Sequence, residues 1–292
     1  MKITSVQDRV INIVLILFFI VLSAIFIYPL LYSLSLSVCD AQKLGTQNIK
    51  LLPVGFTLQS YQYLLSDGRI LRYYINTILY ASTGTFVTLL LTSMIAYPLS
   101  IKTFSGRGWI TIFLLITMFF SGGLIPTYLL IAKMKMLNTI WVMILPGAIG
   151  AWNVIVYKTF FSQLPDSLVE SARIDGASHI TVLFMIIIPL SKALLATMAL
   201  FSLVGFWNDY LRALIYLQKT DMQPIQMLLR KLLVTLDYKD MQFINQANRL
   251  ALTSSRTVKC AAVIITVAPI LCVYPYLQKY FAKGILVGSI KG

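Results

Sequence analysis

The chain is poor in acidic residues, cysteine and histidine, and each scarcity excludes a kind of site. Its 292 residues include 10 Asp and Glu, three Cys and one His, which is His179. A single histidine leaves no histidine-based metal site and no Ser-His-Asp triad. Cys39, Cys260 and Cys272 lack the spacing of metal ligands, and the chain has no Gly-x-x-x-x-Gly-Lys-Ser/Thr phosphate loop. We therefore expect no metal site, no catalytic residues and no nucleotide hydrolysis in this chain.

Apolar residues dominate the composition. They make up 58% of the chain, against 12% charged residues, which is too many to hide inside a water-soluble core of this size. Runs of about 20 apolar residues, the length that crosses a bilayer, recur along the chain. The sequence predicts an all-α polytopic membrane protein with six transmembrane helices in one domain, 1–292. The expected spans are 10–36, 73–99, 109–132, 139–157, 191–217 and 260–277.

The net charge of +14 does not indicate nucleic-acid binding. The 24 Lys and Arg are scattered through every loop, as expected for charge that flanks membrane helices beside lipid headgroups. The positive-inside rule does not orient the chain, because termini placed inside leave most of these cations outside. Many of them lie in the long loop that starts at Arg212, and long loops obey the rule poorly.

The two longer stretches between spans, 38–72 and 218–259, contain too many apolar and aromatic residues for disordered linkers. We expect both to fold against the outer face. An amphipathic helix should begin after Pro224 and lie on the membrane surface or touch a partner. Glycine and proline interrupt the third and fourth spans at 121–126 and 145–147, where they suit a pathway lining or close helix packing.

A polar segment between the fourth and fifth spans has the local code of two helices that meet at a turn. Ser167 and Glu170 fit a capping box that starts the first helix, and Gly176 supplies a left-handed residue that ends it. Ser178 can cap the second helix, which should run to Pro189. The expected apolar face of this second helix comprises Ile180, Leu183, Phe184, Ile187 and Ile188.

This segment resembles the coupling loop of ATP-binding-cassette importer permeases, whose pattern is Glu-Ala-Ala, then Asp-Gly-Ala, then Ile-x-Leu-Pro. The chain matches it from Glu170 to Pro189, with mild departures at Ser171 and Ile188. The resemblance implies a type I importer fold in which the loop, about 162–190, faces the ATPase in the cytoplasm. It implies ATPase-coupling roles for Glu170, Ala172, Asp175, Gly176, Ala177 and Ser178.

Further stretches at 122–127, 137–139, 146–148 and 204–210 are similar to carbohydrate-uptake permeases of the maltose-importer class. They are most similar to the lipoprotein-associated branch that imports oligosaccharides. The C-terminal tail, about 281–292, is similar to that of the shorter maltose-type subunit, whose C-terminus reaches into the ATPase dimer. The resemblance therefore implies ATPase contacts for Gly284, Gly288 and Lys291.

These resemblances imply an ATP-driven importer of a carbohydrate, an oligosaccharide in particular. The expected partners are a second homologous permease, two ATP-binding subunits that bind ATP and Mg, an extracellular solute-binding protein and membrane lipids. The location is the bacterial cytoplasmic membrane, with both termini in the cytoplasm. The alternatives are an importer of a non-sugar solute and a secondary transporter, although inverted repeats and intramembrane acidic relays are not evident.

A polar and aromatic cluster at 207–210 lies a little past the middle of the expected fifth span. A carboxylate within a span usually faces protein or water, and aromatic rings with polar acceptors suit sugar hydroxyls. The alternative is an interfacial belt at the outer membrane edge. Because successive helical residues turn by about 100°, we expect Asn208 or Asp209 to face inward and Trp207 to pack on a neighbouring helix. The candidate pathway residues are Asn76, Asn153, Trp207, Asn208, Asp209 and Tyr210.

Overall fold

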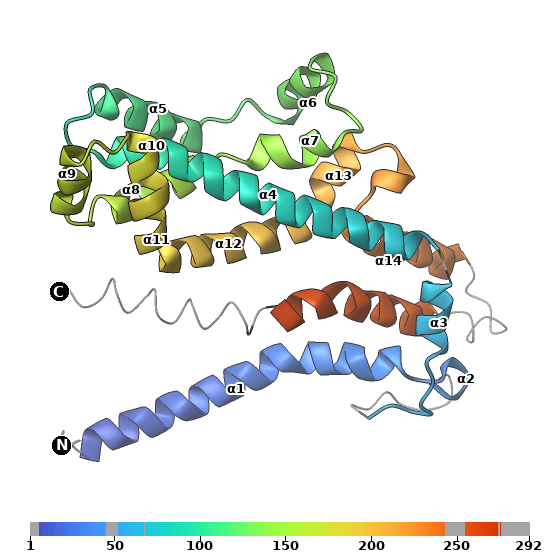
Figure 1. Cartoon of the computed structure of the whole chain (residues 1–292). Coiled ribbons are helices and arrows are strands. Elements are labelled where there is room, and N and C mark those ends of the chain that lie inside the picture. The colour runs from blue at the N-terminus through green and yellow to red at the C-terminus, as the bar shows by residue number, and fades with distance from the viewer. Residues whose placement is uncertain (1–5, 45–51, 67, 243–254, 274, 276–292) are drawn as a thin grey trace. The chain divides into compact units, whose positions relative to one another are not determined.

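The structure is a computed structural model that describes residues 6–44, 52–66, 68–242, 255–273 and 275. The expected ATPase-contacting residues Gly284, Gly288 and Lys291 lie outside the described residues. Within the described part, every regular element is a helix, and one isolated bridge joins Cys39 to Phe56 (Figure 1). The prediction of an all-α protein is confirmed.

Three helices are long and apolar enough to cross a membrane alone, namely α1 (Val6–Ser37), α4 (Arg69–Ser100) and the helix Ser255–Val273. They correspond to the expected first, second and sixth spans. The remaining elements are α2 (Ala41–Leu44), α3 (Gln59–Leu65), α5 (Arg107–Phe119), α6 (Leu124–Lys133), α7 (Ile140–Ile144), η1 (Leu145–Gly147), α8 (Ala151–Phe161), α9 (Asp166–Ile174), α10 (His179–Val182), η2 (Leu183–Ile187), α11 (Ile188–Leu190), α12 (Lys192–Trp207), α13 (Tyr210–Tyr216), η3 (Thr220–Met222) and α14 (Ile225–Gln242).

The other three expected spans are not straight helices. Bends of 114° between α5 and α6 and of 54° between α7–η1 and α8 divide the expected third and fourth spans, and a bend of 84° between α10–α11 and α12 lies where the expected fifth span begins. Six spans result if each bent pair is one span. The first bend follows Gly123, whose φ is +83°, and the second follows the short helix η1, which contains Pro146. Glycine and proline therefore break these helices, as their backbone preferences require.

The expected fifth span, 191–217, needs a correction. The helix α12 ends at Trp207, and a new helix, α13, begins at Tyr210. Asp209 starts α13, because its side chain accepts a hydrogen bond from the Arg212 backbone N–H at 3.1 Å. An aspartate in this role caps the N-terminus of a helix, so the polar cluster lies at a break between helices and not within one.

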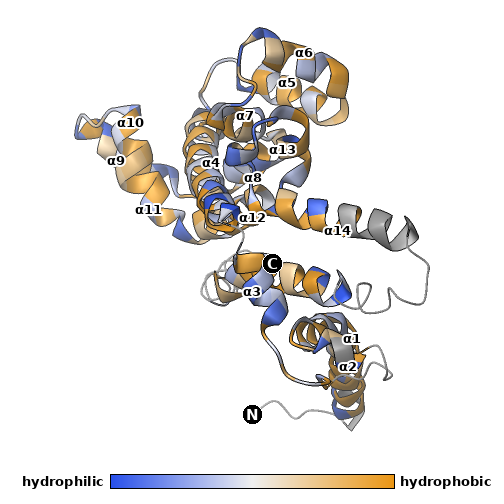
Figure 2. Cartoon of the chain, turned by 90° about the vertical axis from the view of Figure 1, so that its right-hand side faces the viewer, coloured by the Kyte–Doolittle hydropathy of each residue, from blue (hydrophilic) through white to orange (hydrophobic). Residues whose placement is uncertain are grey.

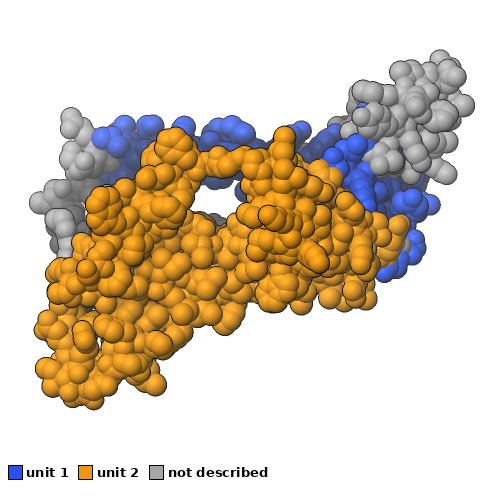
Figure 3. Space-filling view, turned by 90° about the horizontal axis from the view of Figure 1, so that it is seen from above, with its two compact units in different colours: residues 1–68, 229–268 blue, residues 69–228, 269–292 orange. Residues whose placement is uncertain are grey.

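The described residues form two compact units (Figure 3), of which the first comprises Met1–Gly68 and Leu229–Ala268. In this unit the Ser37 and Tyr61 hydroxyls are 2.7 Å apart, and the Ser60 hydroxyl donates to Thr257 at 3.0 Å. These contacts fix α3 to the end of α1 and to the helix Ser255–Val273. The described part of the stretch 38–72 is therefore folded, as expected.

The second unit comprises Arg69–Leu228 and Pro269–Gly292, and α4 is its central helix. Helices α12, α8, α7 and α5 pack against α4, whereas α5 buries none of its own residues and is largely apolar (Figure 2). An apolar surface of this kind suits lipid or another membrane helix. The amphipathic helix expected after Pro224 is confirmed as α14, and its first residue, Ile225, is fully buried.

Candidate functional site

The turn between α9 and α10 is a Schellman motif built on Gly176. The φ of Gly176 is +80°, its N–H donates to Arg173 O at 3.0 Å, and the Ala177 N–H donates to Ala172 O at 2.9 Å. These two bonds satisfy carbonyls that the end of α9 would otherwise leave without partners. The expectation that Gly176 ends the first helix through a left-handed conformation is confirmed.

The two helix starts in this segment differ from each other. Ser178 caps α10, because its hydroxyl accepts the Thr181 N–H at 3.1 Å, as expected. The capping box of Ser167 with Glu170 is wrong. The helix α9 begins directly after Pro165, which is its N-cap residue and makes no side-chain cap bond. This places Ser167 inside the first turn, so Glu170 does not take part in a capping box, and its side chain is exposed.

The C-terminal end of α9 and the residue that follows it are exposed and combine charge with a large apolar side chain. Glu170, Arg173, Ile174 and Asp175 are all exposed, and we call these four residues the docking face. Ile174 is 86% exposed. Glu170 and Ile174 are four residues apart and therefore adjacent on the helix surface, so both side chains are available for contact with another protein.

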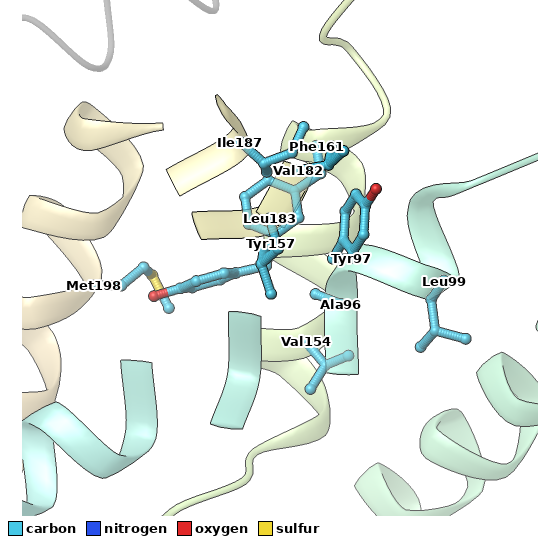
Figure 4. Packing of buried hydrophobic residues seen from close by; sticks show 10 residues of the cluster. All are labelled: Ala96, Tyr97, Leu99, Val154, Tyr157, Phe161, Val182, Leu183, Ile187 and Met198. Atoms are coloured by element: carbon cyan, nitrogen blue, oxygen red, sulfur yellow. The ribbon is translucent and has the colours of Figure 1, made fainter. Parts of the chain in front are cut away.

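The opposite side of the segment is anchored in the core of the second unit. Val182, Leu183 and Ile187 join residues of α4 and α8 in one buried cluster, shown in Figure 4. Ala172 and Ala177 pack against the same cluster. Small side chains at these two positions let the turn lie close to the core. This packing gives a structural reason for alanine at two of the expected coupling positions.

The expected apolar face of the second helix is only partly correct. Leu183 and Ile187 are buried as expected, but Ile180 is 67% exposed and Val182 is buried. Ile180 and Val182 both lie in α10, before the π-helix η2 begins. Val182 rather than Ile180 is buried there because it packs with residues of α4 and α8.

A cavity of about 290 Å³ lies in the second unit between α4, α8, α12 and α13. Its lining includes the polar residues Thr88, Asn153 and Ser202, and Phe201 and Phe206 supply aromatic rings. The Thr88 hydroxyl itself is buried and has no hydrogen-bond partner among the described residues. The remaining lining residues are Gly147, Gly205, Asp209 and Arg212.

An ion pair stands at one end of this cavity. Arg212 Nε lies 3.1 Å from Asp209 Oδ2, and Arg212 Nη1 donates to the Met143 carbonyl at 2.6 Å. The guanidinium also lies 5.8 Å from the centre of the Phe206 ring. These contacts join the break before α13 to the end of α7, so the pair fixes one wall of the cavity.

The six candidate pathway residues do not share one place. Asn153 and Asp209 line the cavity. Trp207 is buried, and its ring lies 6.5 Å from that of Tyr74 on α4. Asn208 is exposed and accepts a hydrogen bond from Gln226 at 3.0 Å. The two others are Tyr210, which is exposed, and Asn76, which is buried near one end of α4.

Asn76 holds a loop in place. Its amide donates to the carbonyls of Asp221 at 2.7 Å and Gln223 at 3.1 Å. Replacing Asn76 with Leu should lower the unfolding free energy by about 1–3 kcal/mol, because two carbonyls lose their donor. Denaturant unfolding in detergent measures this effect, and Ser82→Ala on the exposed side of α4 is the control. An unfolding free energy equal to that of the control would show that the loop does not depend on this amide.

Of the residues that line the cavity, the sequence analysis identified Asn153 and Asp209 as candidates and missed the others. Arg212 stands three residues after Asp209, a spacing that allows ion pairs on a helix, so the pair could have been found from this signal. Thr88, Phe201 and Phe206 carry no comparable signal, because their meeting depends on how α4 and α12 pack.

The chain matches the family described as "Binding-protein-dependent transport system inner membrane component" over residues 2–287. Because this match spans nearly the whole sequence, the chain belongs to this family. It is therefore a permease subunit of an ATP-binding-cassette importer in the inner membrane, and such a permease works with an ATPase and a binding protein. The resemblance to ATP-binding-cassette importer permeases and the helical importer fold are confirmed.

Particular relatives agree with this assignment. The chain is 41% identical to Protein LplC of Bacillus subtilis (strain 168), covering 97% of this chain and 96% of that protein. It is 34% identical to the polygalacturonan/rhamnogalacturonan transport system permease protein YtcP of the same organism, covering 98% and 100%. A crystal structure of a bacterial ABC transporter involved in the import of the acidic polysaccharide alginate matches with a TM-score of 0.85 and 29% identity, covering 96% of this chain and 100% of that one.

Proposed function

We propose that this chain is the permease subunit of an importer that carries an oligosaccharide across the bacterial cytoplasmic membrane. The relatives named for sugar polymers support a carbohydrate cargo. The proposal includes a second homologous permease as partner and two ATPase subunits that bind ATP and Mg. Both termini are in the cytoplasm, since the loop that holds α9 must face the ATPases.

The proposal rests on the α9–α10 segment, which is exposed on one side and packed into the core on the other. Its docking face is exposed, with Ile174 at its centre, whereas Val182, Leu183 and Ile187 are packed between α4 and α8. A push on the docking face therefore reaches two helices through a tightly packed core. Packed cores change between discrete arrangements and do not deform continuously.

This arrangement provides a route from ATP to the cavity. ATP binding closes the ATPase pair, the segment moves with it, and α4 and α8 change their packing. Thr88 of α4 and Asn153 of α8 both line the cavity, so a shift of these helices alters its walls directly. The permease then alternates between outward-open and inward-open states, and the ATPases select between them.

Reconstitution of the complete importer tests the cargo. Proteoliposomes containing this chain, its partner permease, the ATPases and the cognate binding protein should take up oligosaccharides from a glycan panel in an ATP-dependent manner. Amino acids and short peptides serve as the comparison panel. Uptake of those solutes with no response to any glycan would overturn the carbohydrate cargo and leave the family assignment intact.

Ile174→Asp should reduce ATP-coupled uptake by about 10-fold or more, because burying an isoleucine is worth about 1.5–3 kcal/mol and a carboxylate cannot replace it. The reduction should accompany weaker copurification of the ATPase. Gln163→Asp adds the same charge at an exposed position outside the docking face and should leave uptake close to wild type. Equal behaviour of the two variants would remove Ile174 from the contact.

Glu170→Ala should also weaken coupling, because Glu170 is the only glutamate in the chain and lies exposed beside Ile174. A charged hydrogen bond to a partner is worth about 1.5–3 kcal/mol, which corresponds to roughly 10-fold in affinity for the ATPase. Glu170→Gln keeps the shape and separates charge from size. If both variants hydrolyse ATP and transport normally, the carboxylate has no part in docking.

A further inference from the structure

The charges that line the cavity cancel each other. Asp209 and Arg212 are the two charged residues among the described residues of its lining. Arg212 Nε lies 3.1 Å from Asp209 Oδ2, while Asp209 Oδ1 accepts the Arg212 backbone N–H at 3.1 Å. Both carboxylate oxygens are therefore engaged by the same arginine, and the lining carries no net charge.

The guanidinium cannot turn toward a ligand without loss. Its Nη1 is bonded to the Met143 carbonyl at 2.6 Å, and Nη2 lies against Gly147, where an added Cβ would be only 2.7 Å away. The side chains of Arg212 and Asp209 are 23% and 17% exposed. A rotation would leave a largely buried carboxylate without its cation, which is costly.

The other lining groups suit uncharged sugar rings. The hydroxyl of Ser202 and the amide of Asn153 can exchange hydrogen bonds with sugar hydroxyls, and Phe201 and Phe206 present rings on which sugars can pack. The volume of about 290 Å³ is near the lower limit of small-molecule sites, about 300 Å³, so one ring at a time would fit.

We propose that the cavity accepts uncharged sugar residues and disfavours uronates, with Asp209 as the residue that sets this preference. The inference rests on the proposed carbohydrate function and adds the charge of the sugar to it. Asp209 already occupies the one cation in the described lining, Arg212. A uronate carboxylate in the cavity would therefore lose its hydration without gaining a counterion, which is costly.

Protection from a thiol reagent measures the preference without the binding protein. The assembled importer would carry Ser202→Cys as reporter in a background lacking Cys39, Cys260 and Cys272. The probes are a galacturonate trisaccharide and its methyl ester, tested in each nucleotide state. The ester should slow labelling at concentrations about 10-fold lower than the free acid, given the cost of burying a carboxylate without a counterion. Equal or better protection by the free acid would overturn the proposal.

Variants then assign the effect to one residue. Asp209→Asn keeps the shape and the cap, since asparagine is an equally good N-cap, and it should improve protection by the free acid by about 10-fold relative to the ester. Asp221→Asn removes the same charge from an exposed position outside the cavity and should change nothing. An unchanged ratio in a folded Asp209→Asn importer would show that Asp209 does not set the preference.

A second substitution covers the case in which Asp209→Asn does not assemble. Asn153→Asp adds a carboxylate to the lining without touching the ion pair, and it should weaken protection by the free acid further while sparing the ester. No change in this ratio would contradict the proposal. If neither sugar protects in any state, the cavity is not a sugar site, and uptake of the glycan panel decides the cargo separately.

Discussion

Gly176→Leu is expected to uncouple transport from ATP hydrolysis while the protein still inserts into the membrane. The φ of +80° costs a residue with a side chain about 1–2 kcal/mol. An added Cβ would meet no atom within 4 Å, so the penalty comes from the backbone alone. Relaxation of this strain breaks the Schellman bonds and turns the docking face of α9 away from α10. The sugar transported per ATP hydrolysed should fall by about 10-fold or more, as 1.4 kcal/mol corresponds to tenfold.

Two controls separate coupling from general strain. Gly106 has a φ of +85° and also has open space around its Cβ position, but it precedes α5 and lies outside the coupling segment. Gly106→Leu should therefore bring similar strain and leave the coupling ratio intact. Gly176→Asn should retain most coupling, because asparagine tolerates the left-handed conformation. Equal coupling ratios for the two leucine variants would contradict the role of this turn.

Removing either member of the Asp209–Arg212 pair should destabilise the protein, and removing both should cost less than the sum of the two single changes. Asp209→Ala takes away the cap of α13 and leaves a mostly buried guanidinium unpaired. Arg212→Ala leaves the carboxylate unpaired and the Met143 carbonyl without this donor. We expect each single change to lower the unfolding free energy by about 2–4 kcal/mol. The double variant should lose clearly less than the sum.

Denaturant unfolding of the purified importer in detergent provides this double-mutant cycle. Asp221→Ala is the matched control, because it removes an exposed aspartate of the same unit. A coupling energy close to zero would mean that the two side chains are independent, and the wall of the cavity would then be held by packing alone.

Local signals in the sequence were sufficient for the turn of the candidate site. Gly176 and Ser178 act through their own backbone and side chain, so their roles follow from residue type and position, and the structure confirms both. The start of α9 was misjudged because Pro165 already fixes the backbone there. The docking isoleucine, Ile174, was missed because the apolar pattern was sought only in the second helix.

Long-range packing explains the remaining differences. Hydropathy averaged over 20 residues joins α12 and α13 into one span, since the single carboxylate of Asp209 barely lowers the mean. In the second helix Val182 is buried in place of Ile180, because α4 and α8 pack against that side of α10. Arg212 reaches Met143 across a sequence separation of 69 residues, which is a contact that only the folded chain reveals.

Two glycines confine the side chains at the end of the cavity, and this has a consequence for how the sequence can evolve. A Cβ on Gly84 would lie 2.7 Å from the Phe206 ring, and a Cβ on Gly147 would lie 2.7 Å from the Arg212 guanidinium. A larger residue at 84 therefore requires the Phe206 ring to move or to be replaced by a smaller side chain, and a larger residue at 147 displaces the Arg212 guanidinium in the same way. In homologous permeases, substitutions at 84 should therefore accompany substitutions at 206, and those at 147 should accompany those at 212. The summed side-chain volume of each pair should be kept while the individual residues change.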